Sequence, residues 1–111
     1  MASELETLYE QVSKVRSGAA ADEKTAALFE AGREKIAKKV VEESAEVSLA
    51  YIQGNDEDLV SETADLFYNL VVLLADRGIP LSRVWEEMSM RRDALGIAGK
   101  LPKANREGSR D

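Results

Sequence analysis

The stretch REKIAKKVVEESAEVSLAYIQ, residues 33–53, decides the fold of this chain. Its apolar side chains recur with the spacing of one helix face, at Ile36, Val40 and Val47. Glu43 falls within the same apolar stripe. A carboxylate there is costly unless it meets a cation, a metal ion or a hydrogen-bond donor. The stretch therefore predicts a long helix with an acidic group on its inner face.

A second stretch, NDEDLVSETADLFYNLVVLLADRG at residues 55–78, is apolar around most of a helix circumference and should be buried nearly all round. Asn55 has the residue type of an N-cap, and Gly78 ends the pattern. The remaining narrow stripe is polar and holds Glu62, Asp65, Asn69 and Asp76. Exposure of this stripe to water would also expose its apolar flanks. We expect it to face a partly enclosed cavity, opposite the acidic border of the first helix.

The segments before these two stretches have the spacing of shorter helices. Ser3 and Glu6 form a capping-box pattern that begins a helix over 3–16. Another helix is expected to begin near Asp22 and to end or bend at Gly32. Both would supply apolar contacts to the longer helices.

The last helix is expected at LSRVWEEMSMRRDAL, residues 81–95, and Gly96 ends it. Residues 97–111 are polar and interrupted by Gly and Pro, so we expect a loose tail. No internal repeat or second domain is visible. The fold class predicted is an all-α bundle of about five helices in one domain over 1–96, followed by the polar tail 97–111.

The composition of the 111-residue chain excludes several classes of protein. A net charge of −6, from 21 acidic and 15 basic residues, argues against nucleic-acid binding. With no cysteine and no histidine, the chain has neither Cys-ligated zinc nor a Ser-His-Asp triad. The charged first residues and the lack of an apolar run of about 20 residues argue against a secretion signal and a membrane span. We expect a cytoplasmic protein that uses carboxylates, hydroxyls and amines, with or without a hard metal ion.

Two pairs of carboxylates, Glu43 with Glu46 and Glu62 with Asp65, occur at i and i+3 on the two long helices. Salt bridges to nearby lysines and arginines are one explanation. However, the members of each pair repel one another, and carboxylates converging from facing helices are typical of metal sites in helical bundles. Oxygen ligands without His or Cys select a hard ion, Mg²⁺ or Mn²⁺. Because Mg²⁺ usually acts on phosphates, these residues indicate a bundle that handles a phosphorylated ligand.

The order of these acids resembles the motif of the all-α nucleoside triphosphate pyrophosphohydrolases, the MazG-like superfamily. Glu42, Glu43 and Glu46 match its EExxE element, and Glu62 and Asp65 match its ExxD element. The resemblance implies a MazG-like helical fold.

Residues 24–51, KTAALFEAGREKIAKKVVEESAEVSLAY, are similar to one branch of that superfamily, the phosphoribosyl-ATP pyrophosphohydrolases of histidine biosynthesis. Thr25, Gly32 and Lys39 fall on positions of that branch's pattern. The similarity extends over about residues 22–100. Tyr68-Asn69 stands where this branch commonly has Tyr-His, so a relative that hydrolyses another nucleotide stays open.

The resemblance implies that the ligands of a Mg²⁺ ion are Glu43, Glu46, Glu62 and Asp65. The ion would bridge triphosphate oxygens while a water attacks the α-phosphorus and releases pyrophosphate. Without histidine, a carboxylate takes the proton, and Glu42 and Glu46 are the candidates. Lys39 is a candidate to neutralise phosphate charge or to orient these acids, although an ion pair with Glu43 at i+4 explains it equally well.

Three further residues are candidates to bind the substrate. Asn69 shares the acidic stripe and is placed to bind a phosphate or a water on the metal. Arg91 and Arg92 close the last helix and are placed to bind the ribose phosphate, although compensation of the helix dipole also accounts for them. Trp85 recurs with apolar residues at helical spacing, which predicts a core or dimer contact.

The resemblance also implies a homo-oligomer, a dimer or a dimer of dimers. The helix at 55–78, apolar over most of its surface, agrees with this because about four helices cannot easily cover it. Three functions follow. The first is Mg²⁺-dependent hydrolysis of phosphoribosyl-ATP to phosphoribosyl-AMP and pyrophosphate, the second step of histidine biosynthesis. The second is a house-cleaning pyrophosphohydrolase for another nucleotide, and the third is a non-catalytic helical dimerisation module.

Overall fold

Five α-helices make up the computed structural model, which describes residues 3–96 and 98. No strand occurs in this part of the chain, which confirms the all-α prediction. The helices are α1 (Glu4–Ser17), α2 (Glu23–Ala31), α3 (Arg33–Gln53), α4 (Asp56–Asp76) and α5 (Leu81–Leu95).

The helices begin at the residues that the sequence marks as caps. The Ser3 hydroxyl accepts a hydrogen bond from the Glu6 N–H at 3.1 Å, at the start of α1. The Asn55 side chain accepts one from the Asp58 N–H at 3.0 Å, at the start of α4. Each bond satisfies a backbone donor that the first helical turn leaves unpaired. Local chemistry therefore sets these boundaries, before any tertiary contact.

Gly32 joins α2 directly to α3 without an intervening loop. Its φ of +100° lies in the region that only glycine adopts without strain, and its N–H donates to the Leu28 carbonyl at 3.2 Å. The chain turns there within a single residue. One face of α2 is thereby fixed beside the first turns of α3.

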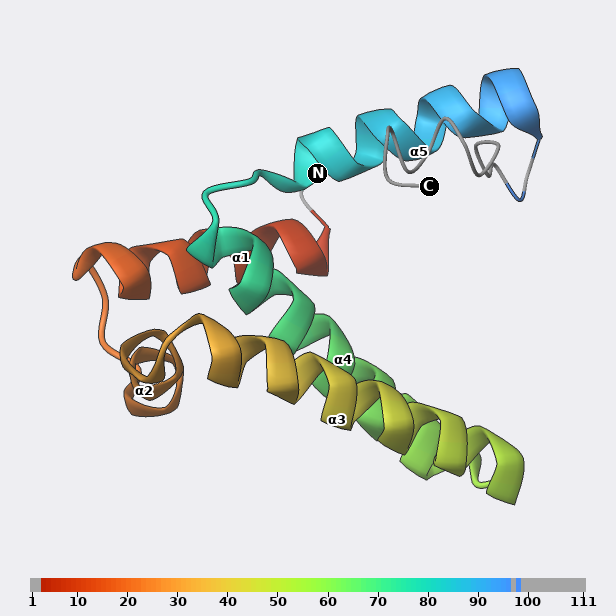
Figure 1. The fold of residues 1–111 in the computed structure, drawn as a ribbon, viewed down its shortest axis with the longest axis horizontal. Coiled ribbons are helices and arrows are strands. Elements are labelled where there is room, and N and C mark those ends of the chain that lie inside the picture. The colour runs from red at the N-terminus through yellow and green to blue at the C-terminus, as the bar shows by residue number, and fades with distance from the viewer. Residues whose placement is uncertain (1–2, 97, 99–111) are drawn as a thin grey trace. The chain divides into compact units, whose positions relative to one another are not determined.

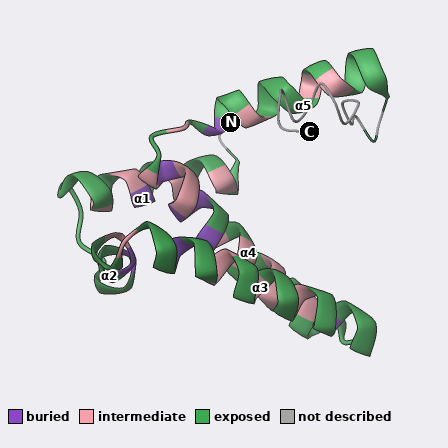
Figure 2. Ribbon diagram, in the orientation of Figure 1, coloured by how far each residue is buried: buried purple, intermediate pink, exposed green. Residues whose placement is uncertain are grey.

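The long helices α3 and α4 lie side by side and antiparallel, and they share the most extensive contact between elements (Figure 1). α1 packs on α4, and α2 packs on α3 and α1. The buried core lies where these four helices meet, and its members are Val12, Leu28, Ile36, Val71, Val72 and Ala75. Figure 2 shows most of the buried segments of α1 to α4 gathered at this end of the helix pair.

The far end of the α3–α4 pair has no such cover. Ile52 is 76% exposed at the end of α3, and Val60 is 71% exposed in the first turns of α4. Phe67 and Leu70 on α4 are also exposed. The expectation that this helix is buried nearly all round is therefore wrong for the single chain. α1 and α2 are too short to cover both ends of the pair.

The chain divides into two compact units, with the boundary between Ile79 and Pro80. The first unit holds α1 to α4, and the Tyr9 hydroxyl closes it by donating to the Ile79 carbonyl at 2.8 Å. The second unit holds α5, which exposes Met88 and about a third of Trp85. The tail predicted over 97–111 lies outside the described residues except for residue 98. None of the described helices is long and apolar enough for a membrane span.

Candidate functional site

Three of the four carboxylates predicted as metal ligands come together in the first unit. Glu43 of α3 and Glu62 and Asp65 of α4 each place one carboxylate oxygen within 4.8 Å of the other two. The spacing of i and i+3 sets the α4 pair on one face, and the antiparallel contact with α3 brings Glu43 opposite. Glu43 is the most enclosed of the predicted acids on α3, with 15% of its side chain exposed.

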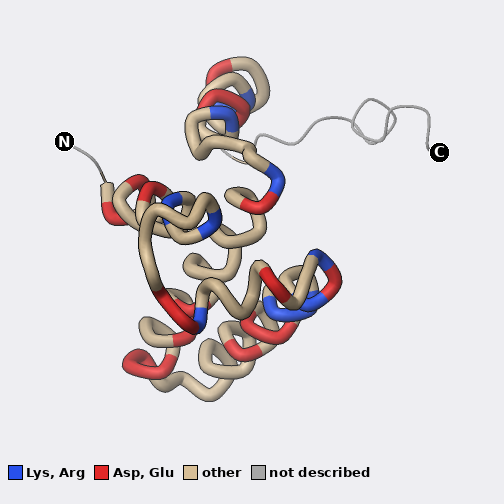
Figure 3. Tube along the Cα trace, turned by 90° about the vertical axis from the view of Figure 1, so that its left-hand side faces the viewer, with Lys and Arg blue, Asp and Glu red and all other residues tan. Residues whose placement is uncertain are grey.

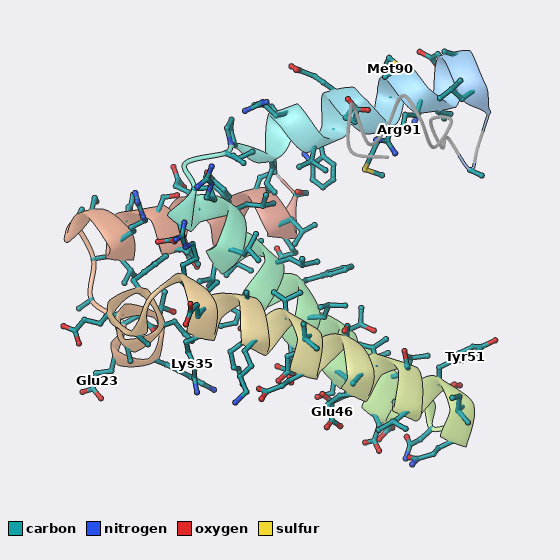
Figure 4. The ribbon with its side chains drawn as sticks, viewed as in Figure 1. Glu23, Lys35, Glu46, Tyr51, Met90 and Arg91 are labelled. Atoms are coloured by element: carbon teal, nitrogen blue, oxygen red, sulfur yellow. The ribbon has the colours of Figure 1, made fainter. Side chains whose placement is uncertain are left out.

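Glu46, the fourth predicted ligand, lies on the exposed side of α3 and outside this three-residue cluster. Its charge nevertheless acts on Glu62, so the two carboxylates are close enough to interact. In Figure 4 the labelled side chains of Glu46 and Lys35 extend to the same side of α3.

The electrostatics of the cluster show that negative charge is in excess. The pKa of Glu62 is raised above its ordinary value, first because of desolvation, and then because of the like charges of Glu46, Asp65, Glu43 and Asp58. Each of these causes disfavours the ionised form. A cation bound among these oxygens would offset the repulsion between the like charges and favour the ionised form of Glu62.

Lys39 is the nearest cation to the cluster. Its Nζ donates to Glu43 Oε2 at 3.4 Å and lies 4.0 Å from Glu42 Oε1. Glu42 is half exposed and also pairs with Lys38 at 3.9 Å, so it faces the rim and not the cluster. The ion pair expected between Lys39 and Glu43 is therefore present. The resemblance implies a further role for Lys39, which is to neutralise phosphate charge or to orient the acids.

A cavity of about 460 Å³ opens beside the carboxylates, between α2, α3 and α4. Its wall carries two acids, three lysines, an amide, a phenol and small apolar side chains: Glu43, Asp65, Lys24, Lys35, Lys39, Asn69, Tyr68, Ala27, Leu28 and Ala31. Figure 3 shows that basic and acidic segments are interspersed along the described trace. Along α3 the basic residues come mainly first and the acidic ones follow. The cavity therefore has a cationic end and an anionic end.

Asn69 is held rigidly in this wall. It is 5% exposed, and its Nδ2 donates to the Asp65 carbonyl of its own helix at 2.9 Å. Asp76, on the same polar stripe, instead pairs with Arg16 of α1 at 3.5 Å. One part of the polar stripe of α4 therefore lines the cavity, and another part contacts α1.

Thr25 and Tyr68 form a polar bridge between α2 and α4. Their hydroxyls share a hydrogen bond, and Thr25 is 4% exposed. The Thr25 N–H also donates to Asp22 at 3.0 Å, and this hydrogen bond is the first cause of the lowered pKa of Asp22. The bridge fixes the wall that Tyr68 contributes to the cavity.

Arg91 and Arg92 lie on α5, in the second unit. Arg91 Nε donates to Glu87 at 2.8 Å, and Arg92 Nε lies 3.9 Å from Asp93. Their role in substrate binding remains a prediction from the sequence.

Sequence reasoning missed Lys24 and Lys35 as lining residues of the cavity. A signal for Lys35 was present, because Lys35, Lys39 and Glu43 recur at i, i+4 and i+8 on one face of α3. Lys24 had no such signal. Its position depends on the turn at Gly32, which brings α2 against α3.

The arrangement fits a hard divalent cation. The three clustered groups offer only oxygen, the ligand atom that Mg²⁺ prefers. Their oxygens lie within 4.8 Å of one another, so these three residues would hold such an ion. A cation held there, with lysines across the cavity, is suited to a ligand that carries several negative charges.

A sequence family described as phosphoribosyl-ATP pyrophosphohydrolase matches residues 6–92 of this chain. The matched range contains the three clustered carboxylates and all the residues that line the cavity.

Individual relatives agree with this match. A phosphoribosyl-ATP pyrophosphatase 2 from Rhodopseudomonas palustris is 46% identical over 104 residues, which cover 94% of this chain and 79% of the relative. A phosphoribosyl-ATP pyrophosphatase from Trichlorobacter lovleyi is 47% identical over 97 residues, covering 86% of this chain and 89% of the relative. One from Azospirillum brasilense is 39% identical over 99 residues, 89% of each chain.

Proposed function

This chain belongs to the phosphoribosyl-ATP pyrophosphohydrolase family, and we propose that it hydrolyses phosphoribosyl-ATP to phosphoribosyl-AMP and pyrophosphate. This reaction is the second step of histidine biosynthesis. The observation that carries the proposal is the cluster of Glu43, Glu62 and Asp65 at the edge of a cavity with lysines on its other wall. A cytoplasmic location is part of the same proposal.

The Mg²⁺ ligands that we propose are Glu43, Glu62 and Asp65, with Glu46 completing the set from the exposed side of α3. When bound, Mg²⁺ would supply charge neutralisation at the phosphate oxygens, the usual work of the ion in phosphoryl chemistry. Mn²⁺, which takes the same oxygen ligands, is an alternative ion. The pKa of Glu62, raised first by desolvation and then by the like charges around it, supports this assignment.

The protein's own groups would orient the substrate and accept the proton of the attacking water. Glu46 is exposed, and Glu42 is half exposed, so water reaches both carboxylates and either can act as the base. Lys39, which is 3.4 Å from Glu43, would hold that carboxylate and attract the triphosphate. Asn69, rigid in the cavity wall, would hydrogen-bond a phosphate or a water. Arg91 and Arg92 remain candidates for the ribose phosphate.

We also propose that the protein acts as a homo-oligomer, a dimer or a dimer of dimers. The exposed end of the α3–α4 pair supports this, because Ile52 and Val60 are each more than 70% exposed in the single chain. Apolar side chains gathered on one surface mark association sites. Light scattering after size exclusion should give a mass of at least two chains. Substitution of Ile52 by lysine should reduce that mass, and a monomeric wild type would refute the assembly.

The test of the function is pyrophosphate release from phosphoribosyl-ATP, with ATP and dUTP assayed beside it, each with Mg²⁺ and with a chelator. We expect Mg²⁺-dependent cleavage of phosphoribosyl-ATP and far slower release from the other two nucleotides. Cleavage of another nucleotide with phosphoribosyl-ATP left intact would assign the protein to the house-cleaning activity. No release from any nucleotide would favour the dimerisation module.

A further inference from the structure

Two lysines on the cationic wall of the cavity have no acidic partner among the residues that the structure describes. Lys24 comes from α2 and Lys35 from α3, and both line the 460 Å³ cavity. In the described part of the chain, neither lies within 4.0 Å of a carboxylate, whereas Lys38 and Lys39 both do. The charge of Lys24 acts on Asp22 only through space. In a chain with a net charge of −6, two unpaired cations at one cavity are well placed for an anionic ligand.

Helix stability does not explain these lysines. Lys24 lies in the first turn of α2, and Lys35 lies in the first turn of α3. The positive end of the helix dipole disfavours a cation in the first turn. Lysines at these positions cost stability, and an anion bound between the two helices would offset that cost. The small side chains between them, Ala27 and Ala31, leave room for such a group.

The position of Lys35 along α3 indicates which anion the two lysines meet. Lys35 precedes Glu43 by eight residues, which is roughly 12 Å along the helix at 1.5 Å per residue. Lys39, one turn nearer, already serves the carboxylate cluster at 3.4 Å from Glu43. A triphosphate at the cluster lies beside Lys39. An anion at Lys24 and Lys35 therefore belongs to another part of the ligand.

We propose that Lys24 and Lys35 bind the terminal monophosphate of the phosphoribosyl group, at the opposite end of the substrate from the triphosphate. This inference rests on the proposed function. Phosphoribosyl-ATP carries this second phosphate and ATP does not, so the lysine pair selects phosphoribosyl-ATP over free ATP. Two lysines contribute charge-assisted hydrogen bonds to the phosphate, while the clustered carboxylates at the other end take the metal and the triphosphate.

The test is the double variant Lys24→Gln/Lys35→Gln, which removes both charges and keeps a polar side chain only one atom shorter. We expect its KM for phosphoribosyl-ATP to rise at least about tenfold, because both charge-assisted hydrogen bonds are replaced by weaker neutral ones. The value of kcat should stay within about threefold of wild type, because this phosphate takes no part in bond cleavage. Lys24→Arg/Lys35→Arg should restore most of the KM. Lys14→Gln, an exposed lysine of α1 that lies away from the cavity, is the matched control.

A second readout identifies the phosphate without metal or turnover. Calorimetry in a chelator compares phosphoribosyl-AMP with AMP, which differ in the phosphoribosyl group. Wild type should bind phosphoribosyl-AMP about tenfold more tightly, and the double Gln variant should lose that preference. In the separate turnover assay with Mg²⁺, inhibition by pyrophosphate should be the same in both proteins.

An unchanged KM and an unchanged preference in the double variant would overturn the proposal. Weaker inhibition by pyrophosphate with the preference intact would also overturn it, by assigning the lysines to the leaving group. Normal cleavage of phosphoribosyl-ATP by such a variant would leave the proposed function standing. A wild type that binds phosphoribosyl-AMP through the lysines, yet cleaves no phosphoribosyl-ATP, would instead refute the function and keep the subsite.

Discussion

The two ends of the α3–α4 pair carry similar side chains in opposite environments. At one end, Ile36 is 3% exposed and Val72 is fully buried, because α1 and α2 pack over them. At the other end, Ile52 is 76% exposed and Val60 is 71% exposed. Composition does not separate the two ends. The two ends differ because the short helices α1 and α2 pack over only one half of the pair.

The carboxylate cluster lies between these two environments. Glu43 and Asp65 are both near the middle of their 21-residue helices. On one side the cluster adjoins the packed core, where charges are poorly solvated, and on the other it adjoins surface that the single chain exposes. A site at this boundary keeps access to water and substrate while its ligands are held by rigid helices.

The largest effect should come from a change in the carboxylate cluster, which lies between the covered and the exposed end of the helix pair. Asp65→Asn keeps the shape of the side chain and removes the charge that the cation needs. We expect kcat/KM for pyrophosphate release to fall by about 10²–10³-fold, the loss typical of one charge-stabilising group. Glu57→Gln, an exposed acid in the first turn of α4, should have little effect. A loss of less than tenfold in Asp65→Asn would remove this carboxylate from the site.

The same substitution at the two ends of α4 tests the difference in cover directly. Val72→Ala should lower the free energy of unfolding by about 2 kcal/mol because it leaves a cavity in the core. Val60→Ala should change it by less than about 0.5 kcal/mol in the monomer. Urea unfolding over a range of protein concentrations measures both. An effect of Val60→Ala that grows with protein concentration would show that a second chain covers this end.

The polar bridge at the covered end should contribute less than the apolar core. Thr25→Val leaves the Tyr68 hydroxyl without its partner and should cost about 1 kcal/mol in urea unfolding. Thr25→Val/Tyr68→Phe removes both hydroxyls and should cost less than the single change. Equal or greater loss in the double variant would mean that the hydroxyls also serve other contacts. Thr7→Val, at an exposed position of α1, is the control.

The smallest effect should be the pH dependence of the metal-free cluster. Because the pKa of Glu62 is raised in the folded chain, the folded state keeps this proton to higher pH than the unfolded state. The contribution of Glu62 to the free energy of unfolding therefore falls as the pH rises from its ordinary pKa of 4.5 through its raised pKa in the folded chain. Glu62→Gln should raise Tm slightly at about pH 7 in a chelator and leave it unchanged at about pH 4. A destabilised variant at neutral pH would contradict this account.

The sequence predicted the helices well because their signals are local. Ser3 and Asn55 cap their helices through side chains three residues from the donors, and apolar spacing is visible within each segment. The facing carboxylates were also predictable, since Glu43 lies in an apolar stripe and Glu62 and Asp65 occupy a narrow polar one.

Contacts that cross between helices could not be predicted in the same way. The Thr25–Tyr68 bridge joins residues 43 positions apart, and nothing near either residue indicates the other. The exposure of Val60 was predicted wrongly because an apolar helix looks the same in sequence whether its own chain or another chain covers it. The position of Lys24 in the cavity wall depends on the angle of the turn at Gly32. That angle is a three-dimensional property and cannot be read from the residues near Lys24.

The one-residue connection at Gly32 leaves the chain no slack between the two walls of the cavity. Apart from the two chain neighbours of Gly32, no described residue has an atom within 4 Å of the place where a side chain would begin, so the requirement for glycine is one of backbone geometry and not of space. An inserted or deleted residue here would change the angle between α2 and α3 and carry Lys24 away from the cavity. The one-residue turn at Gly32 thus sets the spacing between the proposed phosphate-binding groups on α2 and α3. Insertions at this turn should therefore be rare in active relatives.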